Sequence, residues 1–564
     1  MGAAQKRTMN ILIGGEAGQG LVTVGQILAK SLVRSGYSIC VTQDYQSRIR
    51  GGHNTFAIRV GVDAVNAPQE TIELLVALTA ETVGLHRDQV SEGGLIVIDE
   101  ALHIQGDGTL TVPFSQLAAD QYTNIAALGV CSALLGLDDE VVAQTVVDFF
   151  GKAHREVIEG NRQVLGESYR WAIGQAVAFA KLPPIAHPPE RLMMNGNEAI
   201  ALGAVTAGVK FCSFYPMTPA TSIALNLAGW AHEMGLVVEQ AEDEIAAINM
   251  ALGAAFAGAP SMVGTSGGGF ALMIEGVSLA AMTETPVVIV VAQRPAPATG
   301  LPTRTEQADL ELVLHAGHGE FPRAIFSPGT IEQCFELTQK ALQVADRYQG
   351  PVFILTDQFL ADSYRAVVPF DLDGITPVQP WSTEGLRFAT PYRRFAITDS
   401  GVSPRLLPGL TEHLVVADSD EHTEDGHITE DLGVRQEMVQ KRLKKEAGIR
   451  GEVIPPEVQG AERPDLLLVC WGSNKGSVEE AAEQLGSTGK KVATLHFPQV
   501  WPLVPEHFMG PLQEAKEVIA VEGNATGQLA RLIRRETGFH IERLVLRYDG
   551  LPITPEFILR ELNP

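Results

Sequence analysis

The chain has 564 residues, of which 67 are acidic and 42 are basic, and its formal net charge is −25. At about 150 residues per domain, this length predicts roughly three to four domains with cores that need no disulfides. A protein that binds the phosphate backbone needs a surplus of Lys and Arg, so the acidic balance argues against a nucleic-acid partner.

The cysteines stand far apart in the sequence, at positions 40, 131, 212, 334 and 470. This spacing offers neither a disulfide framework nor a ligand cluster for zinc or iron–sulfur, so we predict a reducing, cytoplasmic location and no metal site on the chain. The uncharged stretch 245–274 contains Pro260 and six glycines. Because these residues break helices, we predict a buried helix, strand and loop there, and no membrane span.

The first 180 residues predict an α/β domain. A strand-like run at 9–13 leads into a glycine loop at 14–20, a helical pattern and a second strand at 38–41. A glycine turn before a helix exposes backbone N–H groups that suit an anion. The third glycine of a dinucleotide fingerprint would fall at position 23, which is Thr23, so Gly18 and Gly20 can equally serve only a tight turn.

A second candidate for anion binding is the stretch 47–53. Ser47, Arg48 and Arg50 precede two glycines there, and two guanidinium groups beside flexible backbone can clamp an anion. A solvated loop explains the same residues.

The remaining organisation follows from prolines and from the alternation of strands and helices. Four prolines in 181–190 predict a linker over 181–192, and buried strands near 286–292 and 352–356 predict a parallel sheet within a second domain, 193–370. Residues 371–463 are expected to be an irregular connecting segment, and 464–564 a third α/β domain. The predicted fold is therefore three α/β domains with mainly parallel sheets.

Three polar residues of the second domain stand where chemistry is expected. Pro216 and Pro219 fix the backbone around Thr218 directly after the strand-like run 211–214, at the edge where open α/β sheets bind ligands. Glu244 is the last charge before thirty uncharged residues; a carboxylate against such an apolar wall loses hydration and favours sharing a proton. An ordinary acidic helix start is the alternative, and it suits Glu242 and Asp243 well.

Arg294 directly follows a buried strand. Its planar fork suits a substrate carboxylate, although a structural ion pair is the alternative.

Taken together, the motifs resemble the thiamine-diphosphate-dependent 2-oxoacid:ferredoxin oxidoreductases, most closely the KorA-type large subunit of 2-oxoglutarate:ferredoxin oxidoreductase with fused γ and α parts. The stretches that carry the resemblance are, in chain order, GGEAGQG, SRIRGGHN, YPMTPATS, EQAEDEIAA, QRPAPATGLPTRTEQ, DEHTEDGHITED, WGSNKG, VEGNATGQL and YDGLPITPE. The resemblance implies a γ-type domain, a pyrimidine-binding domain and a transketolase C-terminal-like domain.

The resemblance also implies roles for individual residues. Glu244 matches the glutamate that bonds the N1′ nitrogen of the cofactor's aminopyrimidine, and Thr218, Arg294 and Thr303 match residues that hold the 2-oxoacid. We expect further contacts to thiamine diphosphate from Tyr215, Ser266 and Gly267. Coenzyme A or another anion is expected at Gly18, Gly20, Ser47 and Arg50.

Two features that this chemistry needs are missing from the sequence. A 4Fe-4S cluster takes about four thiolates, and the GDG at 106–108 lies outside any strand–helix unit that could hold Mg²⁺ and a diphosphate. The resemblance therefore implies a β subunit that carries thiamine diphosphate, Mg²⁺ and the cluster, in an (αβ)2 assembly. The implied reaction converts 2-oxoglutarate, coenzyme A and oxidised ferredoxin into succinyl-CoA, CO2 and reduced ferredoxin, or runs in reverse.

Two other hypotheses stay open from the sequence. One is a nicotinamide-dependent dehydrogenase built on the first glycine loop, which the misplaced third glycine argues against. The other is a non-catalytic protein that binds acyl-CoA or a nucleotide, which the joint presence of Thr218, Glu244 and Arg294 argues against.

Overall fold

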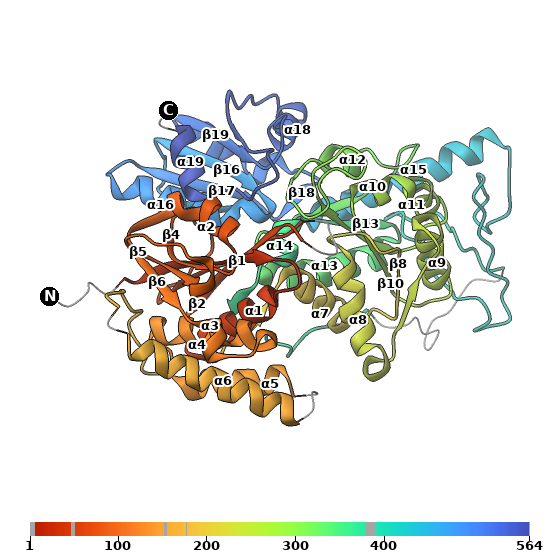
Figure 1. Cartoon of the computed structure of the whole chain (residues 1–564). Coiled ribbons are helices and arrows are strands. Elements are labelled where there is room, and N and C mark those ends of the chain that lie inside the picture. Colours follow the sequence, from red (N-terminus) through yellow and green to blue (C-terminus); the bar gives the residue numbers. More distant parts are fainter. Residues whose placement is uncertain (1–5, 47–50, 152–154, 176, 379–390, 563–564) are drawn as a thin grey trace. The chain divides into compact units, whose positions relative to one another are not determined.

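The computed structural model describes residues 6–46, 51–151, 155–175, 177–378 and 391–562. The chain divides into two compact units (Figure 1). The first unit contains residues 1–195, 362–370 and 554–560, and the second contains 196–361, 371–553 and 561–564. Each unit is described separately below.

The first unit is built on a mixed sheet with the strand order β6-β5-β4-β1-β3-β2-β14-β7. The strands are β1 (Thr8–Glu16), β2 (Ser38–Asp44), β3 (His53–Gly61), β4 (Ile72–Ala77), β5 (Val90–Asp99), β6 (Thr109–Val112), β7 (Leu192–Met194) and β14 (Arg365–Val367). Strands β1 and β2, expected from the opening strand–helix–strand pattern, do not pair with each other, because β3 lies between them and is antiparallel to both.

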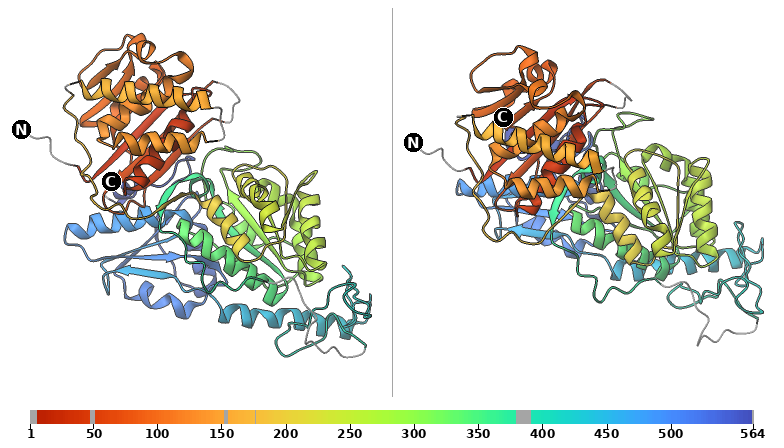
Figure 2. Two further views of the ribbon diagram at one scale, coloured as in Figure 1. Left: turned by 90° about the horizontal axis from the view of Figure 1, so that it is seen from below. Right: turned by 60° about the horizontal axis from the view of Figure 1, so that its bottom comes forward.

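Both faces of this sheet are covered by helices. On β1, Ile11 and Ile13 belong to one core and Leu12 to another, as the alternation of side chains along a strand requires. The larger core includes residues of α1 (Leu21–Arg34), α4 (Thr123–Leu135), α5 (Asp139–Phe149) and α6 (Arg155–Ile173), drawn in red to orange over the strands in Figure 2. The smaller core includes Val83 of α2 (Ala80–His86), and α3 (Phe114–Leu117) contributes Phe114 to the larger one.

The second unit contains a largely parallel sheet with the order β18-β12-β13-β11-β10-β8-β9, in which β18 pairs antiparallel with β12. The strands are β8 (Phe211–Phe214), β9 (Val237–Gln240), β10 (Ser261–Thr265), β11 (Val287–Gln293), β12 (Ala324–Phe326), β13 (Pro351–Asp357) and β18 (Gln499–Trp501). The helices of this part are α7 (Gly196–Thr206), α8 (Thr221–Met234), α9 (Glu244–Phe256), α10 (Gly267–Leu272), α11 (Ile274–Met282), α12 (Leu310–Leu314), α13 (Ile331–Tyr348) and α14 (Gln358–Asp362).

A further sheet of the second unit has the order β15-β17-β16-β19-β20, with β15 antiparallel to β17. Its strands are β15 (Glu457–Gly460), β16 (Leu466–Trp471), β17 (Val492–Phe497), β19 (Glu517–Glu522) and β20 (Arg543–Leu546). The helices are α16 (Lys475–Ser487), α17 (Met509–Glu514) and α18 (Gln528–Thr537), whereas most of α19 (Pro555–Leu562) belongs to the first unit. Short 3-10 turns lie at Arg87–Gln89, Glu100–Leu102 and Asp120–Tyr122 in the first unit and at Gly472–Asn474 and Pro505–His507 in the second. Trp471 and Phe497 share one hydrophobic core with Phe353 of β13, so the two sheets of this unit pack together.

The predicted α/β class with mainly parallel sheets is confirmed, whereas the first sheet is mixed. The division into domains stays a prediction, and the structure differs from it at two places. Strands β7 and β14, at the two ends of the expected 193–370 domain, belong to the first unit's sheet. The expected irregular segment 371–463 contains the twenty-residue helix α15 (Leu432–Gly451).

Helix α15 was not predicted from the sequence, because it buries charged residues that are usually exposed. Lys441 and Lys445 both contact the carboxylate of Glu284, whose side chain has no exposed surface, and the Lys441 Nζ–Glu284 Oε1 distance is 2.5 Å. Burial alone would raise the pKa of Glu284, but Lys445, Lys441 and Arg394 outweigh it and lower the pKa to about 2. A stretch that reads as solvated from its charges is therefore part of the interior.

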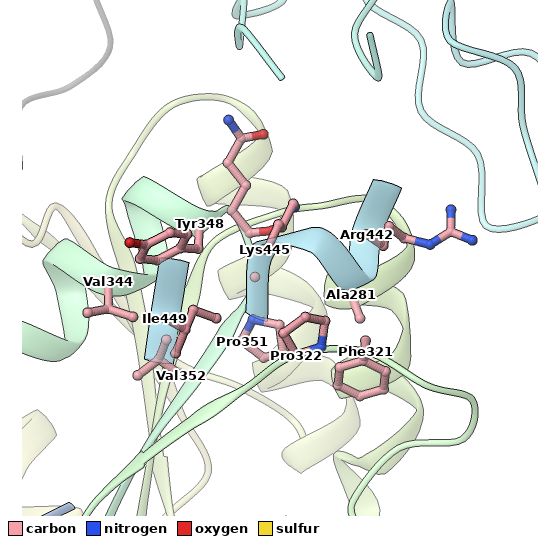
Figure 3. A pocket seen from close by; sticks show the side chains of 12 residues that line it. Ala281, Phe321, Pro322, Val344, Tyr348, Pro351, Val352, Arg442, Lys445 and Ile449 are labelled. Atoms are coloured by element: carbon pink, nitrogen blue, oxygen red, sulfur yellow. The ribbon is translucent and has the colours of Figure 1, made fainter. Parts of the chain in front are cut away.

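A small cavity lies beside α15, and Figure 3 shows Tyr348, Ile449 and Phe321 among the side chains around it. Its volume of ≈ 20 Å³ has room for about one water molecule. The cavity is therefore too small to be a substrate site.

Candidate active site

The candidate site lies at the carboxyl edge of the second unit's parallel sheet. Strand β10 pairs in parallel with β8 on one side and with β11 on the other. Consequently the segments that follow these strands, which start at Tyr215, Ser266 and Arg294, begin at the same edge. This is the edge at which open α/β sheets bind ligands.

Glu244 is the first residue of α9, and its carboxyl group is buried at 3% exposure. Asp243, not Glu244, caps the helix, since Asp243 Oδ1 accepts a bond from the Ala246 N–H at 2.7 Å. The Ser213 hydroxyl donates to the Ala247 carbonyl at 2.6 Å and so ties the helix to β8. Glu244 Oε1 has no hydrogen-bond partner among the described residues. The helix therefore holds Glu244 in place without using its carboxylate.

The glycines after β10 let this carboxylate approach the backbone. A Cβ at position 269 would lie 2.5 Å from Glu244 Oε1 and 2.3 Å from Thr265 Oγ1, so a side chain there would displace one of these two groups. Ser266 is fully buried, and its Oγ also lacks a partner among the residues described. Leaving a buried polar group unsatisfied costs about 1–3 kcal/mol. Two such oxygens at one sheet edge indicate a site built to receive a ligand that donates hydrogen bonds.

Arg294 joins the end of β11 to the loop that follows β8. Its Nη1 donates to the carbonyl oxygen of Thr218 at 2.8 Å, and the residue is 7% exposed. Burial lowers the pKa of the guanidinium, and the negative charge of Asp309 opposes this effect. The structure thus brings together Thr218 and Arg294, two of the residues predicted to hold the 2-oxoacid.

Thr303 lies on a loop that folds back towards Arg294. The Leu301 N–H donates to the carbonyl of Pro295 at 3.1 Å, which returns the chain to the residue next to Arg294. Thr303 is 9% exposed, whereas Tyr215 is 38% exposed. The roles predicted for Thr303 and Tyr215 stay predictions.

Asp309 is a site residue that the sequence reasoning missed. It is 5% exposed, its Oδ2 has no partner among the described residues, and a Cβ at Gly267 would lie 2.3 Å from that oxygen. Burial, with a contribution from Glu306, raises the pKa of Asp309 to about 6, although Arg294 acts in the opposite direction. In the sequence, an Asp directly before α12 resembles an ordinary helix cap, yet its side chain caps nothing.

Gln307 fastens the loop between Thr303 and Asp309 to the last sheet of the second unit. Its side chain donates to the Trp471 carbonyl at 3.0 Å and accepts from Asn474 at 2.6 Å and from the Gly523 N–H at 2.9 Å. The motifs WGSNKG and VEGNATGQL supply these partners. They therefore support the loop that carries Thr303 and Asp309.

The first unit has a separate cavity of ≈ 400 Å³ at the glycine loop. It is lined by Gly18, Gln19, Gly20, Leu78, Asp99, Phe114, Gln121, Thr123 and Asn124. Gly18 and Gly20 thus line a cavity large enough for part of a nucleotide-sized ligand. Ser47 and Arg50, predicted to share this role, lie outside the described residues.

Comparison with known proteins places these features in a family. Residues 202–441 match the family described as pyruvate flavodoxin/ferredoxin oxidoreductase, thiamine diP-bdg, and residues 10–171 match pyruvate ferredoxin/flavodoxin oxidoreductase. A 2-oxoacid:ferredoxin oxidoreductase subunit alpha from a Sulfolobus species is 30% identical, over 96% of this chain and 94% of its own. This chain belongs to the 2-oxoacid:ferredoxin oxidoreductase alpha-subunit family.

Other members of the family are similar over nearly the whole chain. The 2-oxoglutarate oxidoreductase subunit KorA of Mycobacterium tuberculosis is 28% identical over 94% of this chain and 88% of its own. The solved 2-oxoglutarate:ferredoxin oxidoreductase of Magnetococcus marinus, with 2-oxoglutarate, coenzyme A and succinyl-CoA bound, is 31% identical. It covers 99% of both chains with a TM-score of 0.92. The resemblance drawn from the motifs is confirmed at the level of the family.

The residues of this family member fit a thiamine cofactor. The unpartnered Glu244 Oε1, packed against the glycines at the start of α10, suits a heterocycle whose ring nitrogen carries a shared proton. Within the described ranges, no three His, Cys, Asp or Glu side chains gather as metal ligands would. His422 and His427 differ in setting: His422 is buried and its Nδ1 lies 3.0 Å from the Asp420 carbonyl oxygen, whereas the 61% exposed side chain of His427 pairs with Asp425. Across the same part of the chain, every helix is too short or too polar to span a bilayer.

Proposed function

We propose that the chain is the α subunit of a thiamine-diphosphate-dependent 2-oxoacid:ferredoxin oxidoreductase that acts on 2-oxoglutarate together with a β subunit. The reaction would convert 2-oxoglutarate, coenzyme A and oxidised ferredoxin into succinyl-CoA, CO2 and reduced ferredoxin, or run in the carboxylating direction. The observation that carries the proposal is the buried, unpartnered Glu244 carboxylate at the same sheet edge as the Arg294–Thr218 pair. The bound 2-oxoglutarate and succinyl-CoA of the Magnetococcus enzyme support the choice of substrate.

Glu244, Ser266 and Gly267, with Tyr215 at the rim, would hold the aminopyrimidine of thiamine diphosphate. Glu244 would share a proton with the ring nitrogen, which an Oε1 without a protein partner can do. When bound, the cofactor supplies a carbon nucleophile and an electron sink for decarboxylation. The glycines at the start of α10 place bare backbone against this carboxylate.

Arg294, Thr218 and Thr303 would hold the 2-oxoacid head. A buried guanidinium offers two parallel donors to a carboxylate, and low exposure strengthens that bond because little water competes. The carbonyl of Thr218 fixes the guanidinium through Nη1. Arg294 therefore orients the C1 carboxylate, which every 2-oxoacid carries.

Coenzyme A would bind the first unit at the glycine loop, where Gly18 and Gly20 line the cavity. Ser47 and Arg50 complete this part of the proposal from the sequence alone. A β subunit would carry Mg²⁺, the diphosphate end of the cofactor and a 4Fe-4S cluster, in an (αβ)2 assembly that passes electrons to ferredoxin. A cytoplasmic location belongs to the same proposal, since the cysteines at 40, 131, 212, 334 and 470 are all unbridged thiols.

The direct test is to purify the chain with a cysteine-rich partner chain and to measure ferredoxin reduction. We expect reduction that depends on both coenzyme A and 2-oxoglutarate, and weaker reduction with pyruvate. Equal rates with both acids would contradict the choice of substrate alone. Tight NADH binding in an absorbance titration, with no reaction of any 2-oxoacid, would favour the dehydrogenase hypothesis instead.

A further inference from the structure

The backbone of Asp309, and not its side chain, ties this residue to the end of the strand that precedes Arg294. The Asp309 N–H donates to Gln293 Oε1 at 2.9 Å, and Gln293 is the residue directly before Arg294. Gln293 Nε2 in turn donates to the Thr356 carbonyl at 3.1 Å. The position of Asp309 is therefore fixed by the ends of β11 and β13, while its carboxyl group is left without a structural task.

The carboxyl group is enclosed on the opposite side by the turn after β10. A Cβ at position 267 would lie 2.3 Å from Asp309 Oδ2 and 2.6 Å from Oδ1, so the group packs directly on the glycine backbone. Glu244 contacts the same turn at a different residue, Gly269. The two buried carboxyl groups thus pack on different residues of the same segment, Glu244 on Gly269 and Asp309 on Gly267.

The charges that act on Asp309 come from two residues. Glu306, on the same loop, disfavours the charged form, and Arg294 favours it. Burial also disfavours the charged form and is the largest effect. If one arginine stabilises the charged form of an Asp, the pKa of that Asp should rise when the arginine pairs with another carboxylate.

We propose that Asp309 is the electrostatic partner of Arg294 and takes up a proton when a bound carboxylate neutralises the guanidinium. The inference rests on the proposed function for its ligand, a 2-oxoacid. In the unliganded chain the ionised Asp309 balances Arg294. When the substrate carboxylate binds, it takes over that role, and the proton arrives from solvent on an Asp309 oxygen. The site then holds one negative charge beside Arg294 in both states.

The sign of the pH dependence follows from linkage. The liganded state binds the proton more tightly than the free state, so affinity for the 2-oxoacid increases as the pH falls from about 8 towards 6. The increase is at most about tenfold per pH unit, because one proton is linked. Below about pH 6 Asp309 is protonated in both states, and its effect on affinity levels off.

The first experiment follows the Asp309 carboxyl group by infrared spectroscopy of the full chain, with isotope-labelled aspartate to separate it from Glu244 and Glu306. Asp309→Asn identifies its band. In Arg294→Gln the titration midpoint of Asp309 should rise by about 1 pH unit or more, the effect of losing a nearby opposite charge. In Glu306→Gln it should fall. Opposite shifts cannot come from general loosening of the fold, and an unchanged midpoint in Arg294→Gln would overturn the inference.

The second experiment counts protons when 2-oxoglutarate binds to the chain assembled with its partner. Calorimetry at pH 7 in two buffers of different ionisation enthalpy should give an uptake of up to about one proton in wild type and none in Asp309→Asn. Binding without uptake, or equal uptake in the variant, would overturn the inference. If no 2-oxoacid binds in wild type, the proposed function fails and the substrate part of the inference fails with it. The infrared shifts still decide whether Asp309 and Arg294 are coupled.

Discussion

The candidate site contains two buried carboxyl groups that pack on one short glycine turn. Glu244 packs on Gly269 and Asp309 packs on Gly267, so both positions depend on these residues being glycines, which have no side chain. Their surroundings differ: Asp309 has Arg294 and Glu306 near it, whereas Glu244 stands at the start of an apolar helix. Two acids in unlike surroundings can take unlike roles, and we propose that Glu244 acts on the cofactor and Asp309 on Arg294.

Substitution of Glu244 tests the cofactor role. Glu244→Gln keeps the shape of the side chain but removes the charge that can share a proton with the cofactor ring. We expect the ferredoxin-reducing activity of the assembled enzyme to fall by about two to four orders of magnitude, the range for a general acid–base group. Thiamine diphosphate should still bind, because most of its affinity is expected from contacts to Mg²⁺ and diphosphate on the partner.

Glu242→Gln is the matched control, since Glu242 lies two residues away and is exposed. Its activity should stay within about twofold of wild type, as expected for a surface substitution. Near-normal rates in Glu244→Gln together with a large loss in Glu242→Gln would move the role to Glu242.

Substitution of Arg294 tests the carboxylate role. Arg294→Lys keeps the charge but loses the two-pronged donor geometry. Since a hydrogen bond to a charged group contributes about 1.5–3 kcal/mol, kcat/KM should fall by roughly one to two orders of magnitude. The loss should be similar for 2-oxoglutarate and for pyruvate or 2-oxobutyrate, because all of them carry the C1 carboxylate. A loss confined to 2-oxoglutarate would make Arg294 the reader of the distal carboxylate instead.

At the scale of elements, α15 is stabilised by a buried ionic cluster with more cations than anions. Lys441, Lys445 and Arg394 surround the single carboxylate of Glu284. Burial lowers the pKa of Lys441 to about 8, against the effect of Glu284, and the neighbouring cations contribute to the lowering. The cluster therefore depends more on its one anion than on any one of its cations.

Glu284→Gln should destabilise the second unit by about 3–5 kcal/mol, because it leaves buried cations without a counter-charge. Lys441→Met should cost less, since it removes one of three competing cations. The Glu517→Gln control breaks an exposed pair of the same unit, Glu517–Arg543, with side chains 42% and 41% exposed, and should cost at most about 1 kcal/mol. Denaturant unfolding followed by the fluorescence of buried Trp471 measures all three. Equal losses in the Glu284 and Lys441 variants would contradict this account.

The same cluster has a defined pH dependence. The folded-state pKa of Glu284 is lowered from 4.5 to about 2, so its stabilising contribution is present above pH 4.5 and is lost as the pH falls towards 2. The difference in stability between wild type and Glu284→Gln should therefore shrink over that window.

The elements also show how far the sequence could go. Glu244 and Arg294 could be predicted from the sequence because each borders a strongly apolar run: Glu244 precedes one and Arg294 follows another. Such a run is a local pattern. Asp309 and the fold of α15 could not, because their meaning depends on distant partners. Lys441 bonds Glu284 across 157 positions, and the Gln307 that anchors the Asp309 loop bonds Gly523 across 216. A charged residue is expected to be exposed, and its burial can be predicted only when its partner, distant in the sequence, is known.

For the whole molecule, the arrangement of cysteines bears on which chain would carry the electron-transfer part of the proposed reaction. The five cysteines are buried and unbridged. Burial raises the pKa of Cys131 and of Cys212 to about 12, and it raises the pKa of Cys334 and Cys470 well above the ordinary value. A cluster ligand must be a thiolate, so these thiols are poor ligands even before their separation is considered.

We therefore expect the chain purified alone to show no iron–sulfur absorbance and no turnover, even after incubation with iron, sulfide and a reductant. Both should appear when a cysteine-rich partner chain is added, and the absorbance should increase with the amount of partner until it saturates. Iron and sulfide analysis on the separated chains is the control that assigns the cluster. A stoichiometric cluster on the isolated chain would require several cysteines to leave the core. It would therefore contradict both the buried positions of these thiols and the division of the reaction between two chains.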